Sequence, residues 1–360
     1  MTDHRPLVII TDETLLDEVL RAAAATGCEL HRAPDPLAVR AEWIRAPLVL
    51  IDEHVLATGF ELPRRADILL ITKGPPAAAT WERAFEAGVQ QVLSLPDAET
   101  ALMGAFADVV EGPGEPGGCV IGVLGGRGGA GASVFATALA LGGSGSGSGA
   151  LLVDCDPLGG GIDLLLGAEF QDGSRWSGLR LDGGRVSMST LEGALPSHSF
   201  RGRRLPFVSC EPEGAGPTPE AIASVVDAGR RAGRLVVCDL PRNLDACAEA
   251  VLDRADLLVL VVPAEIRSCV SARGVLGRLG TRAGRVRLVV RGPSPGGLAP
   301  ADVADAVKAP LLVSMASERN LGKALDAGQF PFRNRGPLAM AAQVALAALR
   351  AELGVIEAAA

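Results

Sequence analysis

A glycine-rich stretch at residues 125–133 is the feature that most constrains this chain. It reads Gly-Gly-Arg-Gly-Gly-Ala-Gly-Ala-Ser and lies between an apolar run at 119–124 and a helix-like run at 134–141. A strand, a glycine loop and a helix in this order form a phosphate-binding loop, because backbone N–H groups and the helix N-terminus surround anionic oxygens. We therefore expect a nucleotide site at this segment.

One defined position of the phosphate-binding pattern G-x-x-x-x-G-K-[ST] is not matched. Gly126, Gly131 and Ser133 fit the pattern, whereas Ala132 stands where the lysine is expected. The other candidate nucleotide-binding residues of the loop are Arg127, Gly128, Gly129 and Ala130. Because a lost phosphate contact of this kind removes roughly 2–4 kcal/mol of transition-state stabilisation, we expect weakened binding and poor hydrolysis.

Acidic residues end two apolar runs farther along the chain. The run at 150–154 ends in Asp154, and Asp156 follows two residues later, so both side chains are expected to point the same way. A second run ends in Asp239, as is typical of a carboxylate that holds Mg²⁺ beside a nucleotide. We expect Ser133 and Asp239 to hold Mg²⁺, and Asp154 or Asp156 to orient an attacking water.

Residues 1–111 are predicted to form a separate domain. Short apolar runs begin near residues 7, 28, 48, 68 and 92, and helix-like segments follow several of them. Five strand–helix repeats in about a hundred residues predict a small doubly wound parallel α/β sheet.

This first domain resembles the receiver domain of two-component response regulators. In that family, acids after the first strand hold Mg²⁺ and an Asp that ends the third strand accepts a phosphoryl group. The matching positions here are Asp12, Glu13, Asp52 and, at the end of the fourth strand, Thr72. Leu95 replaces the family's lysine, so we expect a degenerate, unphosphorylated receiver that acts as an interaction module. Acids at strand ends are common in any such fold, and a purely structural role for them stays open.

Two Gly-rich segments are predicted to lack regular structure. Residues 112–118 contain only Gly, Pro and one Glu, which predicts a linker. Residues 142–149 contain only Gly and Ser, which predicts a flexible insert, either natural or engineered. The second domain is therefore expected to span 119–360, with a mostly parallel sheet flanked by helices.

Taken together, the motifs of the second domain resemble the deviant-Walker P-loop ATPases of the MinD/ParA group. The loop of that family reads K-G-G-x-G-K-[ST], and its first lysine crosses a dimer interface; Arg127 stands at that position here. The family's D-x-D and D-x-P strand ends match 154–156 and 239–241, and its late Gly- and Pro-containing segment matches 324–331. A receiver-like domain ahead of such an ATPase resembles the CpaE/TadZ subgroup.

The resemblance implies ATP or ADP with Mg²⁺ as cofactor and a homodimer formed through the loop face. Arg291 lies near the position where the family often has an Asn that contacts adenine. The implied function is a cytoplasmic spatial regulator in septum-site determination, or in localising a pilus or secretion apparatus, that acts through protein partners. The alternative is an active ATPase in which Arg127 replaces the missing lysine.

A dinucleotide-binding alternative also fits part of the loop. The residues from Gly126 to Gly131 read G-x-G-x-x-G, and Asp154 ends the next strand, where a Rossmann-type NAD site places its ribose-binding acid. Ser133 and Asp239 favour the nucleoside triphosphate instead.

Composition argues against several other classes. The net charge of −8 does not favour a dedicated nucleic-acid binder, and we interpret two Arg-rich clusters, at 201–204 and 230–234, as solvated helix ends and loops. We find no signal peptide or membrane-spanning run, and the C-terminal helix carries only Arg350 as a basic residue, so we do not expect membrane insertion. Seven scattered cysteines predict reduced thiols in the cytoplasm.

Overall fold

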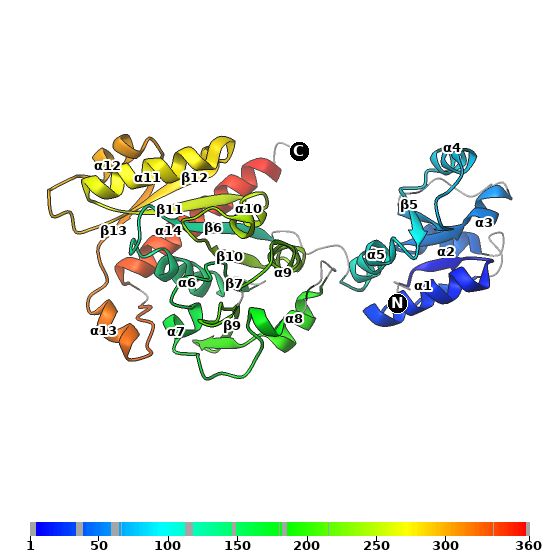
Figure 1. Ribbon diagram of the computed structural model, residues 1–360, viewed down its shortest axis with the longest axis horizontal. Helices are drawn as coiled ribbons and strands as arrows, with labels where there is room; N and C mark the ends of the chain where they lie inside the picture. The colour runs from blue at the N-terminus through cyan, green and yellow to red at the C-terminus, as the bar shows by residue number, and fades with distance from the viewer. Residues whose placement is uncertain are drawn as a thin grey trace. The chain divides into compact units, whose positions relative to one another are not determined.

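The chain forms two compact units, Met1–Gly114 and Glu115–Ala360. The structure, a computed structural model, describes residues 5–33, 39–58, 65, 67–111, 118–145, 149–179, 181, 186–214, 216–333 and 335–357 (Figure 1). The division falls within the expected linker at 112–118, of which only Gly118 is among the described residues.

The first unit is a five-stranded parallel sheet with the strand order β2-β1-β3-β4-β5, which confirms the predicted doubly wound fold. Its strands are β1 (Leu7–Ile9), β2 (His31–Arg32), β3 (Val49–Asp52), β4 (Ile68–Lys73) and β5 (Gln91–Leu95). Its helices are α1 (Glu13–Thr26), α2 (Arg40–Arg45), α3 (Glu53–Ala57), α4 (Ala78–Ala87) and α5 (Glu99–Glu111). The second strand starts later than expected, because α1 ends at Gly27 in the left-handed conformation and the chain must turn before it pairs with β1.

Helices cover both faces of this sheet. On one face, α1 and α5 bury side chains such as Leu16, Val19 and Phe106. On the other face, α2, α3 and α4 contribute Trp43, Val55 and Ala84. The carboxyl ends of the strands are thus left to carry the polar residues of this unit.

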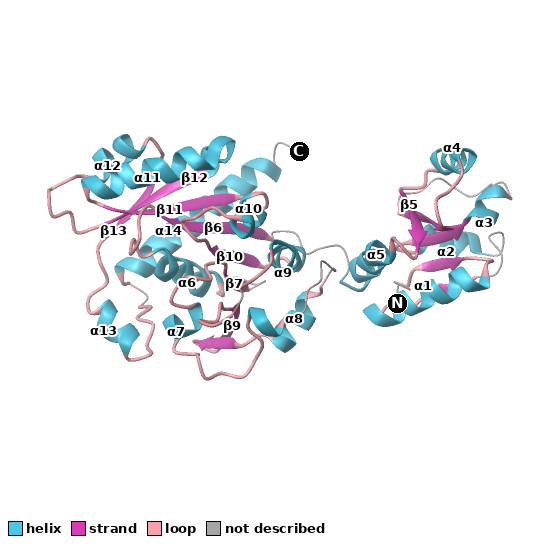
Figure 2. Ribbon diagram, in the orientation of Figure 1, coloured by secondary structure: helices cyan, strands magenta, loops and turns pink. Residues whose placement is uncertain are grey.

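The second unit is an eight-stranded sheet with the order β13-β12-β11-β6-β10-β7-β9-β8. Its strands are β6 (Cys119–Gly125), β7 (Ala150–Asp154), β8 (Ser197–Phe200), β9 (Arg203–Val208), β10 (Leu235–Asp239), β11 (Leu257–Pro263), β12 (Val286–Arg291) and β13 (Leu311–Met315). All neighbours pair in parallel except β8 and β9, which form an antiparallel hairpin at one edge. Figure 2 shows the strands of this sheet in magenta and the helices that flank them in cyan. The predicted, mostly parallel sheet is confirmed, whereas the hairpin strand β8 was not predicted.

Two layers of helices enclose this sheet. One face is covered by α6 (Ala132–Gly143), α7 (Ile162–Leu166) and α14 (Pro337–Glu357). The other face is covered by α8 (Met188–Ala194), α9 (Pro219–Arg231), α10 (Ala246–Leu252), α11 (Ile266–Leu279) and α12 (Pro300–Val307). The short α13 (Leu321–Asp326) lies beside α7, near the carboxyl ends of the strands (Figure 1).

The position of β10 rules out the dinucleotide-binding alternative. In the Rossmann order, the strand before the glycine loop pairs directly with the strand that follows the loop's helix. Here β10 lies between them, since it pairs with β6 on one side and with β7 on the other. Asp154 is therefore one strand too far from the glycine loop for the Rossmann geometry.

The predicted flexible insert at 142–149 is wrong in its first residues. Gly142 and Gly143 belong to α6, and Ser144 is buried, with its hydroxyl donating to the carbonyl of Leu141. A Cβ atom at Gly143 would lie 2.2 Å from Leu235 Cδ2, so the helix needs glycine to approach β10 this closely. Residues 146–148 lie outside the described residues.

Candidate functional site

The glycine loop joins β6 to α6 and leaves several backbone donors free. Gly129 and Gly131 adopt φ values of 70° and 94°, which glycine tolerates. The N–H groups of Gly128, Gly129, Gly131 and Ala132 donate to no group among the residues that the structure describes. A series of free N–H groups at a helix N-terminus forms an anion-binding nest.

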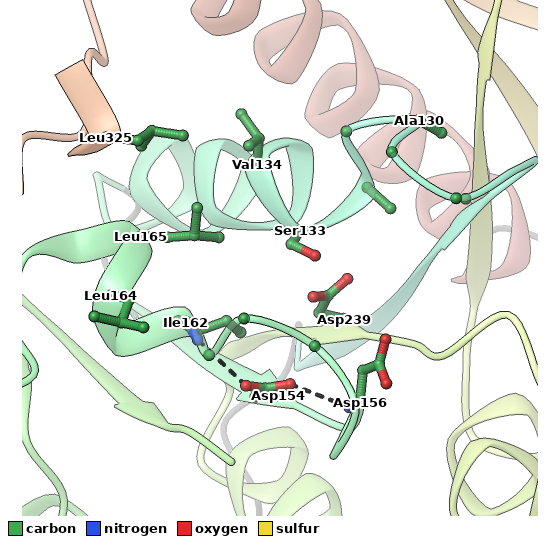
Figure 3. A pocket seen from close by; sticks show the side chains of 18 of the residues that line it. Ala130, Ser133, Val134, Asp154, Asp156, Ile162, Leu164, Leu165, Asp239 and Leu325 are labelled. Carbon is green, nitrogen blue, oxygen red and sulfur yellow. Dashed lines mark hydrogen bonds between the residues drawn. The ribbon is translucent and has the colours of Figure 1, made fainter. Parts of the chain in front are cut away.

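A cavity of about 630 Å³ opens in front of this loop. Its walls come from the loop, from the segments after β7 and β10, and from α7 and α13 (Figure 3). The lining includes Arg127, Gly128, Gly129, Ala130, Gly131, Ala132, Ser133, Asp154, Asp156, Asp239, Arg242 and Asp326. The predicted loop residues therefore gather around one cavity, together with the predicted acids; Gly126 lies just behind it, with its N–H donating to the carbonyl of Val261 at 2.8 Å. The late segment at 324–331 also contributes to the wall, through Leu325, Asp326 and Gly328.

Ser133 and Asp239 lie together on the floor of the cavity (Figure 3). Asp239 is only 4% exposed, and burial raises the pKa of its carboxyl group to about 8. The nearby carboxylates Asp154 and Asp156 raise this pKa further, whereas the hydrogen bond with the Ser133 side chain lowers it. A hydroxyl and a carboxylate side by side are a suitable donor set for Mg²⁺ at a phosphate site.

Asp154 organises the backbone after β7. Its Oδ1 accepts from the N–H of Asp156 at 3.1 Å, and its Oδ2 accepts from the N–H groups of Cys210 at 3.1 Å and Ile162 at 3.3 Å. Burial raises its pKa to about 6, and these backbone hydrogen bonds oppose that shift. Its oxygens are occupied by the protein, which gives Asp154 a positioning role.

Asp156 is the more accessible of the two acids. It is half-buried, and its Oδ1 accepts from the N–H of Leu158 at 3.1 Å. Figure 3 shows its carboxylate directed from the loop after β7 toward the space beside Asp239. Of the two predicted water-orienting residues, Asp156 is the better placed.

Arg127 is bound to its own chain. Its Nη2 lies 3.0 and 3.1 Å from the two carboxylate oxygens of Glu265, and its Nε donates to the Ser268 hydroxyl at 2.8 Å. Glu265 precedes α11 and Ser268 lies in its first turn. The guanidinium is therefore held against the N-terminus of α11.

Arg291, at the end of β12, does not line the cavity walls that the structure describes. Its Nη2 donates to the carbonyl of Gly129 at 3.4 Å, and its side chain packs beside Gly131. Burial lowers its pKa, and the nearby positive charge of Arg127 lowers it further. Arg291 thus supports the glycine loop from the side.

Arg242 is a cavity residue that sequence reasoning missed. It follows Asp239 by three residues and is exposed, and no hydrogen bond or ion pair joins its side chain to the described part of the protein. No motif position assigns a role to it, so only its place in the cavity wall identifies it.

In the first unit, Asp52 ends β3 with its carboxylate surrounded by donors. Its Oδ2 accepts from the N–H of Thr11 at 2.5 Å and from the Thr11 hydroxyl at 2.6 Å, and its Oδ1 accepts from the N–H of Val55 at 2.8 Å. Asp52 is 3% exposed and caps α3. Thr11 therefore lies where an incoming phosphoryl group or metal ion would have to approach.

Of the other predicted receiver residues, Asp12 contacts Asp52 through its backbone N–H, which donates to Asp52 Oδ2 at 3.3 Å. Among the described residues, no hydrogen bond joins Glu13 or Thr72 to Asp52. Asp12 caps α1, where hydrogen bonds from Thr14 and Leu15 lower its pKa, and Glu13 is exposed in the first turn of that helix. The Thr72 hydroxyl hydrogen-bonds Gly74 and Ser94. Lys73, which follows Thr72, donates to the Thr14 hydroxyl at 2.9 Å.

The Arg-rich cluster at 230–234 takes part in ion pairs within the second unit. In the 230–234 cluster, Arg230 pairs with Asp256 and Arg234 pairs with Glu192. Within the described residues, no group of three or more Asp, Glu, His or Cys side chains has metal-binding geometry, and no helix has the length and apolarity to span a membrane.

Both units resemble known proteins. The profile described as "Rv3660c-like, CheY-like N-terminal domain" matches residues 9–117. The uncharacterized protein Rv3660c of Mycobacterium tuberculosis (strain ATCC 25618 / H37Rv) is 42% identical over 347 residues, which cover 95% of this chain and 97% of the relative.

Solved structures resemble the second unit. The ParA family ATPase of Chlorobium tepidum TLS matches with a TM-score of 0.54 and 16% identity, over 62% of this chain and 97% of that chain. The septum site-determining protein MinD of Pyrococcus horikoshii OT3, solved with Mg-ADP, has a TM-score of 0.52 and 19% identity, over 63% and 93%. MinD of Aquifex aeolicus has a TM-score of 0.51 and 23% identity, over 66% and 97%. These likenesses establish a MinD/ParA-like fold.

Proposed function

The chain belongs to the family of Rv3660c-like proteins, and we propose that it is a spatial regulator of the CpaE/TadZ subgroup, of the septum-site-determining type found in actinobacteria. It acts from the cytoplasm in septum placement and cell division, or in localising a pilus or secretion apparatus. The receiver-like unit serves as an interaction module, and the second unit binds ATP or ADP with Mg²⁺ weakly and hydrolyses little of it.

One observation carries this proposal: the cavity keeps the groups that bind a nucleotide but lacks the positive charge of the loop lysine. The free N–H groups of the loop and the Ser133–Asp239 pair suit a phosphate chain with Mg²⁺. The MinD neighbour from Pyrococcus horikoshii was solved with Mg-ADP, which supports the same ligand here. Ala132 supplies no cation, so binding without efficient turnover is the function that these residues favour.

Self-association is part of the proposal. In the MinD/ParA group two loop faces meet, and we infer that this chain forms a homodimer through the same face. Leu158 and Phe170, which are 95% and 94% exposed, come from the segments after β7 and α7 that border the cavity. Apolar side chains exposed to this degree are typical of a surface that a partner covers.

A working ATPase is the second candidate function, with Arg127 in place of the missing lysine. Arg127 does line the cavity, which favours this candidate. Its three hydrogen bonds to Glu265 and Ser268 disfavour it, because they hold the guanidinium on α11.

Three experiments on the full chain test the proposal. Isothermal titration with Mg-ATP and Mg-ADP should show binding, while a turnover assay should show negligible hydrolysis. In cells, a fluorescently tagged chain should concentrate at septa or poles, and Asp239→Asn should weaken nucleotide binding. Turnover at a rate typical of lysine-bearing relatives would favour the second candidate, and a uniform distribution of the tagged chain would contradict a spatial role.

A further inference from the structure

The charges that line the cavity are unbalanced. Among the described lining residues, two arginines, Arg127 and Arg242, face a larger set of acidic side chains. Those acids are Asp154, Asp156, Glu169, Asp239 and Asp326. A nucleotide brings several more negative charges, so its binding requires a cation that is free to meet the phosphates.

Arg127 does not supply a free cation. Its Nε and Nη2 donate to Ser268 and Glu265, and its Nη1 donates to the carbonyl of Gly128 at 3.0 Å. Moving Arg127 onto a phosphate would break these bonds and leave Glu265 without its partner. Arg291 is also committed, because it lies against the carbonyl of Gly129 and outside the cavity lining.

Among the described residues that line the cavity, Arg242 is the remaining cation, and the backbone fixes where its side chain begins. The N–H of Leu240 donates to the carbonyl of Val123 at 2.9 Å, which anchors this segment to β6. Leu240 and Pro241 are buried, and the proline ring restricts the backbone directly before Arg242. The side chain of Arg242 thus begins beside the Mg²⁺ candidate Asp239 and extends into an exposed position on the cavity wall.

We propose that Arg242 binds the phosphate chain of the nucleotide in this cavity and replaces the charge that Ala132 lacks. The inference rests on the proposed nucleotide-binding function. A guanidinium presents paired N–H donors that match two phosphate oxygens, and it stays charged at every physiological pH. The free N–H groups of the loop and Arg242 then approach the phosphates from two different strands, β6 and β10.

A purely structural role for Arg242 predicts a different outcome. The side chain makes no hydrogen bond or ion pair to the described residues, so its removal takes no such contact from the fold. The Arg242→Ala variant is therefore expected to keep the wild-type melting temperature and to lose phosphate affinity. If the role of Arg242 were structural, the Arg242→Ala variant would instead have a lower melting temperature.

The test is isothermal titration of the full chain with a non-hydrolysable ATP analogue plus Mg²⁺ and, separately, with inorganic tripolyphosphate plus Mg²⁺. Arg242→Ala should weaken both ligands about ten- to a hundredfold, because a hydrogen bond to a charged group is lost. Arg242→Lys should restore most of the affinity. Arg273→Ala is the matched control, since it removes an exposed arginine of α11 that lies outside the cavity lining.

The outcomes separate the two proposals. Wild-type affinity in Arg242→Ala would overturn the role of Arg242 and leave nucleotide binding intact. An equal loss of affinity in Arg273→Ala would also overturn the role of Arg242, because the effect would then come from the net charge of the protein. A wild-type chain that binds neither ligand would overturn the proposed nucleotide function together with this inference.

Discussion

Asp154 and Asp239 lie opposite each other in the register of β7 and β10, so two buried carboxyl groups end neighbouring strands at the same level. Their pKa values are raised to about 6 and about 8, with burial as the largest cause for each. The fold therefore concentrates acid groups that resist ionisation at one edge of the sheet.

The first prediction is that the protein loses stability as the pH rises from about 4 to about 8. In the unfolded chain both groups ionise near 3.8, whereas in the folded protein they keep their protons to higher pH. The folded state then binds more protons, so each pH unit in this window costs up to about 1.4 kcal/mol per group. Chemical denaturation at several pH values measures this slope.

The matched variants are Asp239→Asn and Asp305→Asn. Asp239→Asn should flatten the upper part of the slope, up to pH 8, while Asp305→Asn removes an exposed carboxylate on α12 and should keep the wild-type slope. A stability that rises between pH 5 and 8 would show that the raised pKa values are wrong.

The second prediction concerns Mg²⁺. Asp239 can hold the ion only as a carboxylate, and its pKa of about 8 means that Mg²⁺ must displace a proton at neutral pH. Affinity for the Mg²⁺–nucleotide complex should increase from pH 6.5 to 8.5, and calorimetry in buffers of different ionisation enthalpy should detect proton release. Binding without proton release at pH 7 would contradict this.

The third prediction is that Ala132→Lys strengthens ATP binding about ten- to a hundredfold, since Ala132 lines the cavity where the family's lysine stands. Ala132→Met is the control, because it adds a chain of similar length without charge and should keep wild-type affinity. Equal effects of Lys and Met would mean that packing, rather than charge, limits binding.

The fourth prediction is that a small phosphodonor leaves Asp52 unmodified. Thr11 donates twice to the oxygen that would attack, and Leu95 replaces the lysine that couples the site to the rest of the domain. Intact-mass measurement after incubation should show no added phosphoryl group, with Asp52→Asn as the blank. A stable mass increase in the wild type that is absent from Asp52→Asn would refute it.

The fifth prediction concerns self-association. For Arg127 to reach a partner subunit, it must leave Glu265, and that pair is partly exposed and so contributes at most about 1 kcal/mol. Glu265→Gln should therefore strengthen dimerisation by up to several-fold, and Arg127→Ala should weaken it. Sedimentation velocity with and without Mg-ATP measures both; a wild type that stays monomeric at high concentration would disprove the idea.

The regular parts of the fold were predictable because burial leaves a pattern in the sequence. The run at 257–263 is apolar at every position, and all of β11 is buried. In contrast, β8 is short and polar and lies at a sheet edge, so no such pattern marks it. Composition predicts flexibility for Gly142 and Gly143, because it does not reveal how closely α6 approaches its neighbours.

The site was predictable where a motif fixes a residue and unpredictable where tertiary contacts decide. Ser133 and Asp239 lie side by side, since the carboxyl ends of parallel strands share one edge of the sheet. The partner of Arg127 is Glu265, 138 residues away, and no local pattern connects them. Arg242 could be recognised only once the cavity was known.

The insertion of β10 between β6 and β7 also determines the order in which the second unit can fold. The strand β6 begins at Cys119 and pairs with β10 and β11. These two strands start only at Leu235 and Leu257. During synthesis, more than a hundred further residues must be added before the strand that leads into the glycine loop can pair with a neighbour. Such long-range pairing slows folding and exposes apolar strands meanwhile. A chain that stops before β10 should therefore fail to form the centre of the sheet.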